Sequence, residues 1–442
     1  MKQRRTFLVV RPLVLSAAAV LVASGLTACG SGGQGNTSLD KNANVSITMW
    51  TGQSEDAQKV LEKLAAEFEN AHPNVSIDAS PGASSTEDLL QKLSAGFAGK
   101  SYPDISYAYG SWASQLESSG RTLDITDQVA DPEVRWDEFP EGARATVRPT
   151  GEKTIGFPAL VDNLSLLYDK TVFDAAGVPY PTDDWTWDDL RAAAKKITNP
   201  ATNTYGYAYS VSGAENTVWK MWPLLWQNGG EILSEDRTRA AFDSEAGVKA
   251  LTFLRDMAVT DKSVYLDQTD TRYEQLFRND RIGMMTSGPW MLFDLKTAKT
   301  KYGVTRLPGT NGDHQTASAP DIWALFDHKD KNREYWAYEF TRWLTSAPQD
   351  ERWNVEIGNL PLRSSEADSA AFAAQVKTYP GLDVMAANGV NAKKVRPTVP
   401  GYVGLSEAIG EAIAEVLQGR GTPKKALEKA ADKADTALEA AR

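Results

Sequence analysis

The alternation of strand and helix at the start of the chain constrains its fold most. Residues 45–50 alternate apolar and polar side chains as a half-buried strand does, and residues 54–72 space apolar side chains at helical intervals. A second strand at 74–79, a helix opened by a capping box at 84–87 and a third strand at 103–107 follow. This βαβαβ order predicts a parallel sheet with right-handed crossovers.

Aromatic residues follow the ends of these strands. Trp50 ends the first strand, and Tyr109 and Trp112 follow the third. Parallel strands end at one edge of an open α/β sheet, which is where such sheets bind ligands. A single ring of this kind more often serves packing, but rings at equivalent strand ends favour a binding rim.

A comparable junction lies at residues 281–295 (RIGMMTSGPWMLFDL). It predicts a short strand, a tight turn at Gly288 and Pro289, and a helix that opens at Trp290. Glycine allows the sharp turn, and proline suits a first helical position because it has no N–H to leave unpaired. We therefore expect the Trp290 ring beside the carboxyl edge of a sheet.

Two segments are predicted to cross between two lobes. In the first, Asp162 and Asn163 interrupt a pair of apolar strands, so that their acceptor oxygens would face a cleft. The second, at 318–326, contains Asp321 and Trp323. The lobes predicted from these crossings are residues 45–161 with 281–318, and residues 162–280 with 319–442.

A tryptophan-rich helix is predicted at 215–227. Its spacing gives a broad apolar face that would place Trp222 and Trp226 in the core. Trp219 lies nearer the start of the helix, and we expect its ring to face the cleft.

The N-terminus resembles an export signal. A basic stretch precedes an apolar run at 13–26 that is too short and too weakly apolar to predict a membrane span. The run ends at LTAC, and Cys29 is the only cysteine of the chain. This pattern resembles the bacterial lipoprotein box, in which the cysteine is lipidated. Residues 1–28 are therefore predicted to be a lipoprotein signal peptide and residues 29–44 a flexible tether, with general and twin-arginine export both open.

Charge and composition argue against several classes of function. Loss of the signal would change the formal charge from −11 to −15, which disfavours nucleic acid and anionic lipid as partners. His72, His314 and His328 are scattered without the spacing of zinc ligands or of a histidine-based triad. No Walker-type phosphate loop is present, and no cofactor is expected.

In their order and spacing, several segments resemble the extracellular solute-binding proteins of ABC importers, the maltose-binding-protein-like sugar binders. The resemblance covers nearly the whole mature chain. The segments are ITMWTGQSED, KSYPDIS, LSLLYDKTVFDAAGVPYP with TWDDL, MWPLLWQNGG, DRIGMMTSGPW, KYGVTRLPG, GNLPLR and LQGRGTPKKALEKA.

The resemblance implies a two-lobed α/β fold, each lobe a mostly parallel sheet flanked by helices, that closes over a sugar. Trp50, Asp162, Trp219 and Trp290 fall at the family's sugar-contacting positions. Ser111-Trp112 stands where maltose-binding protein has an acidic–basic pair, and Lys220 stands where an aromatic is usual, so maltose itself is not the expected ligand.

The expected site combines rings and acceptors. A pyranose has an apolar C–H face, which an aromatic ring covers, and a belt of hydroxyls, from which a carboxylate accepts charge-assisted hydrogen bonds. The implied protein is a lipid-anchored monomer that binds a carbohydrate outside the cytoplasm and delivers it to an ABC permease. The predicted ligand-binding residues are Trp50, Ser54, Tyr109, Ser111, Trp112, Asp162, Asn163, Trp219, Trp290, Asp321, Trp323 and Arg363.

Two alternatives remain open at this stage. A surface-anchored glycosidase would also trap sugar between rings and carboxylates, with two carboxyl groups about 5–9.5 Å apart. The second alternative is a binding protein of the same fold whose ligand is a phosphorylated polyol or another polar solute. In that case Arg363 and Arg396 on cleft-side loops would bind the anion.

Overall fold

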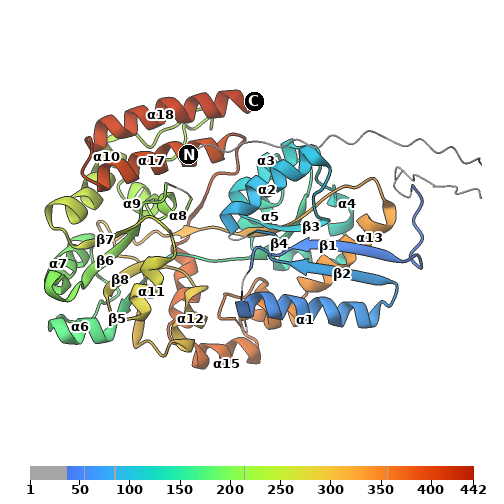
Figure 1. Ribbon diagram of the computed structural model, residues 1–442, viewed down its shortest axis with the longest axis horizontal. Helices are drawn as coiled ribbons and strands as arrows, with labels where there is room; N and C mark the ends of the chain where they lie inside the picture. Colours follow the sequence, from blue (N-terminus) through green and yellow to red (C-terminus); the bar gives the residue numbers. More distant parts are fainter. Residues whose placement is uncertain (1–36, 54, 84–85, 214, 356) are drawn as a thin grey trace, which may run out of the picture. The chain divides into compact units, whose positions relative to one another are not determined.

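Two five-stranded sheets organise the chain, as the computed structural model shows in Figure 1. The structure describes residues 37–442 apart from Ser54, Ser84, Ser85, Ala214 and Glu356. The predicted signal peptide, Cys29 and Ser54 therefore lie outside the described residues. Among the described helices, none has both the length and the apolar character that a bilayer span requires.

The first sheet has the strand order β2-β1-β3-β11-β4. β1 pairs in parallel with β2 and β3, whereas β11 is antiparallel to both β3 and β4. The βαβαβ pattern predicted for the first residues is thus confirmed, with one reversed strand inserted from far along the chain. The strands are β1 (Val45–Trp50), β2 (Val75–Ser80), β3 (Ile105–Ala108), β4 (Gly156–Leu160) and β11 (Asp321–Leu325).

The second sheet repeats this arrangement in the order β7-β6-β8-β5-β9. β6 is parallel to β7 and β8, and β5 is antiparallel to β8 and β9. Each lobe therefore has a mostly parallel sheet with its fourth strand reversed, as the predicted fold class requires. The strands are β5 (Ser165–Asp169), β6 (Tyr205–Ser210), β7 (Val264–Asp267), β8 (Ile282–Ser287) and β9 (Tyr302–Thr305).

Strand pairing corrects the predicted lobe boundaries at two places. β8, within the segment 281–318 that we assigned to the first lobe, pairs with β5 and β6 of the second sheet. β11, within the segment 319–442 assigned to the second lobe, pairs with β3 and β4 of the first. Every residue of both strands is buried. A strand that is covered on both faces carries no alternation to indicate its sheet, so only the pairing itself decides.

Helices cover the first sheet through apolar stripes. In α1, Leu61, Leu64 and Phe68 are buried at helical spacing, and Asp330 caps α13, which packs against β1 and β11. The helices of this lobe are α1 (Glu55–Ala71), α2 (Thr86–Gly99), α3 (Ala113–Ser118), α4 (Thr126–Val129), α5 (Glu141–Thr146), α13 (Lys331–Leu344) and α14 (Ala347–Asp350).

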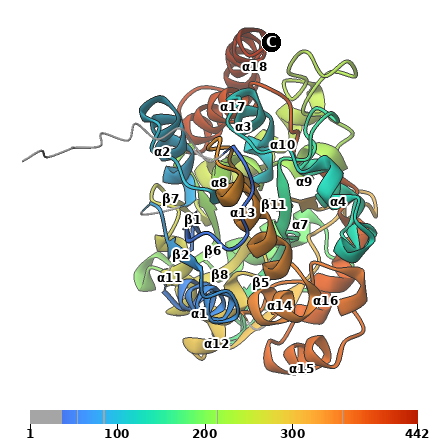
Figure 2. The same ribbon diagram turned by 90° about the vertical axis from the view of Figure 1, so that its right-hand side faces the viewer.

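The second sheet is covered by helices from three parts of the chain. A capping box of Thr186 and Asp189 starts α7, and α17 and α18 lie side by side in Figures 1 and 2. The helices are α6 (Lys170–Ala176), α7 (Trp187–Ile197), α8 (Glu215–Val218), α9 (Trp222–Gln227), α10 (Glu245–Arg255), α11 (Arg272–Arg278), α12 (Met291–Thr297), α15 (Ala370–Thr378), α16 (Leu382–Ala387), α17 (Tyr402–Leu417) and α18 (Pro423–Ala440).

The tryptophan-rich helix predicted at 215–227 is divided in two. α8 ends at Val218, a turn follows, and α9 begins at Trp222 with Pro223 in its first turn. Proline has no N–H for a continuous helix and suits a first turn instead, so Pro223 sets the new start. Trp222 and Trp226 are buried in the core as predicted.

Three segments lie side by side where the chain passes between the sheets. The Leu164 N–H donates to the Ala317 carbonyl at 3.2 Å. β10 (Ala317–Ser318) pairs in parallel with β12 (Lys394–Val395). The first crossing follows the predicted segment. The second lies between β9 and β11, at 306–320 and thus ahead of most of the predicted 318–326, because 321–325 forms β11 of the first sheet. The third segment, which was not predicted, links α16 to α17 of the second lobe and lies beside the two crossings.

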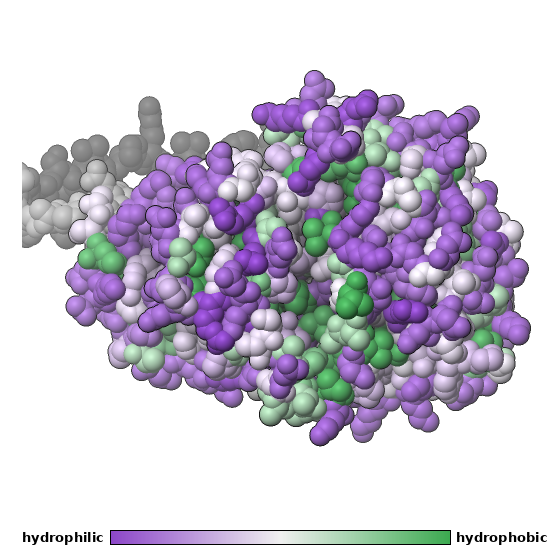
Figure 3. Space-filling view, turned by 180° about the vertical axis from the view of Figure 1, so that it is seen from behind, coloured by the Kyte–Doolittle hydropathy of each residue, from purple (hydrophilic) through white to green (hydrophobic). Residues whose placement is uncertain are grey.

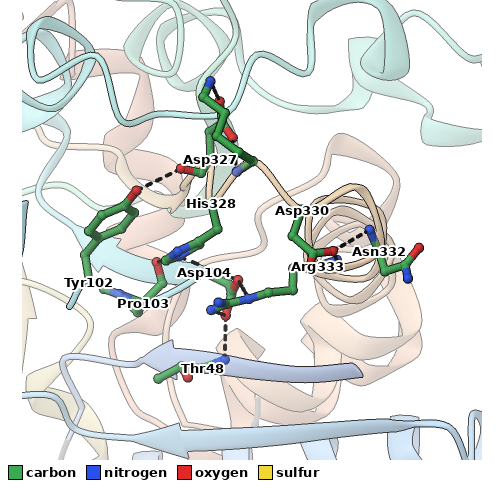
Figure 4. A network of polar contacts seen from close by, with 10 residues as sticks. Thr48, Tyr102, Pro103, Asp104, Asp327, His328, Asp330, Asn332 and Arg333 are labelled. Carbon is green, nitrogen blue, oxygen red and sulfur yellow. Dashed lines mark hydrogen bonds and ion pairs between the residues drawn. The ribbon is translucent and has the colours of Figure 1, made fainter. Parts of the chain in front are cut away.

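A buried aspartate ties β3 to its neighbours in the first lobe (Figure 4). The Asp104 carboxylate accepts from the Thr48 N–H of β1 at 2.8 Å and from Arg333 of α13 at 2.8 and 2.7 Å. The Asp104 side chain is 1% exposed. His328 stacks on Tyr102 with 4.4 Å between ring centroids, and its Nε2 lies 3.7 Å from Asp104. Because a buried carboxylate must keep its partners, this network fixes the sheet against α13.

We expect Asp104→Ala to lower the free energy of unfolding by about 3 kcal/mol, since it removes a buried ion-pair partner and leaves Arg333 and the Thr48 N–H unpaired. Urea denaturation followed by circular dichroism measures the change. Asp137→Ala is the control, because Asp137 pairs with Arg144 while its side chain is 95% exposed, and should cost less than about 1 kcal/mol. Equal losses in the two variants would contradict the structural role of Asp104.

Candidate ligand-binding site

Arg396 lies at the centre of a buried polar cluster where segments of both lobes meet. Its Nη1 donates to Glu215 Oε1 at 3.2 Å, and its Nη2 donates to Asp321 Oδ1 at 3.3 Å. Glu215 begins α8, beside the second sheet, and Asp321 begins β11 of the first sheet. One guanidinium from the segment that links α16 to α17 therefore bridges the two lobes.

Both carboxylates are held by further donors. Tyr107 donates its hydroxyl to Asp321 Oδ2 at 2.6 Å, and the Gly110 N–H donates to Asp321 Oδ1 at 3.1 Å. Tyr402 of α17 donates to Glu215 Oε1 at 3.0 Å. The carboxylate positions are thus fixed by hydrogen bonds from the strands and helices of each lobe.

Aromatic rings from both lobes surround the guanidinium. Its carbon lies 5.4 Å from the ring centroid of Tyr109 and 5.2 Å from that of Trp219. Trp219 stacks on Trp290, with centroids 5.7 Å apart, and Tyr109 contacts Trp112 at 4.6 Å. The structure thus brings four of the predicted aromatic site residues into one contiguous group.

Asp162 and Asp321 interact within this cluster. Asp162 Oδ1 accepts from the Ala319 N–H at 2.9 Å. Burial, and next the charge of Asp321, raise the pKa of Asp162 to about 8, although Arg396 acts in the opposite direction. Burial also raises the pKa of Asp321, to about 6, against the lowering effect of Arg396. Burial and mutual repulsion therefore favour retention of a proton by this pair of carboxyl groups, which lets the pair donate as well as accept.

Two buried polar atoms near these carboxylates have no hydrogen-bond partner in the described part of the chain. They are Arg396 Nε and Ser111 Oγ, on residues that are 6% and 3% exposed. Ser111 follows Gly110, which binds Asp321, in the short helix η1 (Gly110–Trp112). Buried donors of this kind are suited to hydroxyl groups of a ligand.

Other predicted residues have their side chains engaged elsewhere. Trp50 packs with α2 in the first lobe, and the Lys92 ammonium lies 4.1 Å from its ring centroid. Trp323 is fully buried in the core beside Tyr107, with centroids 5.4 Å apart. Asn163 donates to the Met385 carbonyl at 2.8 Å and so ties the first crossing to α16.

Arg363 is held by the backbone of the first lobe. Its Nε donates to the Thr345 carbonyl and its Nη1 to the Val134 carbonyl at 3.0 Å, and its guanidinium carbon lies 4.0 Å from the Phe139 centroid. The structure thus places Arg363 in a packing and loop-fixing position, whereas the cluster at the crossing contains Arg396.

The sequence interpretation did not assign Glu215, Tyr107, Tyr402 or Ser406 to the site. Glu215 precedes Trp219 by four residues, which on a helix places both on one face, and this spacing was the available signal. Tyr402 and Ser406 come from α17, whose approach to Glu215 depends on tertiary packing.

On the face seen in Figure 3, apolar residues gather near the middle of a mostly hydrophilic surface.

The comparisons with known proteins identify the family. Residues 63–382, well over half of the chain, match the family model described as bacterial extracellular solute-binding protein. The chain belongs to the bacterial extracellular solute-binding proteins. Members of this family capture solutes and deliver them to ABC permeases, and the family is one of binding proteins rather than enzymes.

Individual relatives of this solute-binding protein have different ligands in their names. It is 24% identical to the sn-glycerol-3-phosphate-binding periplasmic protein UgpB of Yersinia enterocolitica, covering 91% of this chain and 94% of that one. An ABC substrate-binding protein from Listeria monocytogenes in complex with cycloalternan is similar at a TM-score of 0.79, with 24% identity over 89% of this chain and 99% of that chain. A solute-binding protein from Thermotoga lettingae bound with alpha-D-tagatose gives 0.78 and 25% identity at the same coverage.

We expect Asp162→Asn to reduce the pH dependence of stability. The pKa of Asp162, about 8 in the folded protein, lies above the roughly 3.9 of an unfolded chain. The stability that this carboxyl contributes is therefore complete below about pH 4 and is lost as the pH rises towards about 8. Asparagine keeps an acceptor for the Ala319 N–H but does not titrate. The urea midpoint of the variant, relative to that of wild type, should therefore increase as the pH rises from about 4 to about 8.

Asp137→Asn provides the matched control substitution, because the Asp137 side chain is 95% exposed and pairs with Arg144 instead of with residues of this cluster. Parallel pH profiles for wild type and Asp162→Asn would contradict the raised pKa of Asp162.

Proposed function

We propose that this solute-binding protein captures a carbohydrate, either a mono- or an oligosaccharide, between its lobes and delivers it unchanged to an ABC permease. The observation that carries the proposal is the convergence of rings and fixed carboxylates from both lobes around Arg396. A ligand that contacts both sides of this cluster would stabilise the closed arrangement of the lobes, which couples capture to closure.

The side chains suit the two surfaces of a sugar. The stacked Trp219 and Trp290 offer a large, rigid face for the C–H side of a pyranose, and Trp290 remains half-buried. Asp162 and Asp321 provide oxygen acceptors for hydroxyls, and Ser111 Oγ a further donor or acceptor. Cycloalternan and tagatose in the structures of two relatives agree with this ligand class.

The surroundings of the carboxylates favour binding over hydrolysis. Asp321 accepts from Tyr107, Gly110 and Arg396, and Glu215 accepts from Tyr402, Ser406 and Arg396. A glycosidase needs one carboxyl free to donate a proton to the leaving group and one free to attack or activate water. Asp321 and Glu215 therefore act as fixed acceptors, so that even with a proton on Asp162 no second carboxylate is free to attack or to activate water. We infer that the protein does not catalyse a reaction.

We also propose that the protein is a monomer held at the outer face of the membrane by a lipid on Cys29. The proposed anchor rests on the lipoprotein-like LTAC sequence and on the tether-like composition of residues 29–44. Expression of wild type and Cys29→Ser in a bacterial host with labelled fatty acid should give a labelled, membrane-bound wild type and an unlabelled, soluble variant. Equal labelling of both proteins, or of neither, would contradict the anchor.

We expect Trp290→Ala to weaken sugar binding by at least about 1 kcal/mol, or roughly fivefold in Kd, through loss of an aromatic contact. A panel of sugars and polyols titrated by calorimetry identifies the ligand and then measures the change. Trp343→Ala is the matched control, since Trp343 is also half-buried but packs on Phe68 and Phe340 in the first lobe. A large fall in melting temperature for Trp290→Ala at unchanged affinity would identify Trp290 as a core residue.

A further inference from the structure

The charge balance of the Arg396 cluster distinguishes between the neutral and the phosphorylated ligands that appear in the names of the relatives. The cluster contains three carboxyl groups, those of Asp162, Asp321 and Glu215, and one guanidinium. Arg396 is 6% exposed, and each of its two terminal nitrogens donates to a different carboxylate. Its positive charge is therefore already compensated within the protein.

The aromatic faces further limit access to Arg396. Tyr109 and Trp219 lie against the guanidinium, so that its Nε edge is the part without a protein partner. A phosphate that reached Nε would lie close to Asp321 and Glu215 and would be repelled by both. A ligand hydroxyl group can accept a hydrogen bond from Nε and donate one to a carboxylate without bringing a negative charge near Asp321 and Glu215.

The neighbouring cation offers no alternative anion site. Lys220 follows Trp219, is 4% exposed, and donates to the Tyr273 hydroxyl at 3.0 Å. Burial lowers the pKa of Lys220 to about 8, although the carboxylates of Asp270 and Glu274 act to raise it. The charge of the Lys220 ammonium is thus already balanced by neighbouring carboxylates of the protein, which would repel a ligand phosphate.

We propose that the site selects uncharged, hydroxyl-rich ligands and rejects their phosphorylated counterparts. Arg396 is then a positioning residue that aligns Asp321 and Glu215, and it does not bind an anion. This selectivity rests on the proposed function, because it presumes that ligands enter at the Arg396 cluster.

The test is calorimetric titration of the full mature chain with a series of sugars and polyols, each paired with its own phosphate monoester. We expect each phosphate monoester to bind at least about tenfold more weakly than the neutral ligand of the pair. A phosphate monoester that binds as tightly as its neutral partner, or more tightly, overturns the selectivity while leaving solute capture intact. If no member of the series binds, the proposed function fails as well, so the two failures are distinguishable.

Two variants test the physical cause. Glu215→Gln and Asp321→Asn each remove one negative charge beside Arg396. Each variant should reduce, by about fivefold, the ratio of the affinity for the neutral ligand to the affinity for its phosphate monoester. This is the effect of one charge at about 8 Å in a medium of intermediate polarity. Glu138→Gln is the control, since Glu138 pairs with Arg363 instead, and should leave the ratio unchanged. An unchanged ratio in both site variants, with folding confirmed by circular dichroism, would overturn the role assigned to Arg396.

Discussion

The interaction on which the site depends is the pairing of one buried guanidinium with carboxylates from both lobes. Arg396 contacts Asp321 of the first sheet and Glu215 beside the second, and each carboxylate is held by further donors. Breaking a buried pair of this kind leaves an uncompensated charge, which is costly. The relative placement of the two lobes is thus tied to the same residues that would meet a ligand.

The two lobes use one strand pattern. In each sheet three strands run in parallel, the fourth is reversed, and the fifth returns to the first direction. The reversed strands β11 and β5 both adjoin crossing segments, so the start of each strand brings polar side chains towards the junction. Asp321 begins β11, and Asp162 lies in the crossing segment just before β5, which explains why acceptors gather between two otherwise apolar sheets.

Much of this architecture could be predicted from local sequence. The βαβαβ order, the capping box at Thr186 and the glycine–proline turn before Trp290 each specify their own conformation within a few residues. The sequence placed the rings of Trp219 and Trp290 at a cleft and at a sheet edge, but it did not predict that they stack on each other. Pro223, however, was overlooked, although its missing N–H predicts the break between α8 and α9.

The sequence by itself determined the element types, the polar breaks at the crossings and the family. Tertiary structure alone decided which sheet β8 and β11 join, because strands buried on both faces have no side-chain pattern that distinguishes one sheet from another. It also decided that Arg396 meets Glu215, 181 residues away, whereas Arg363 binds backbone carbonyls. A charged side chain in a loop has no local preference that names its partner, so only the packing of distant segments selects it.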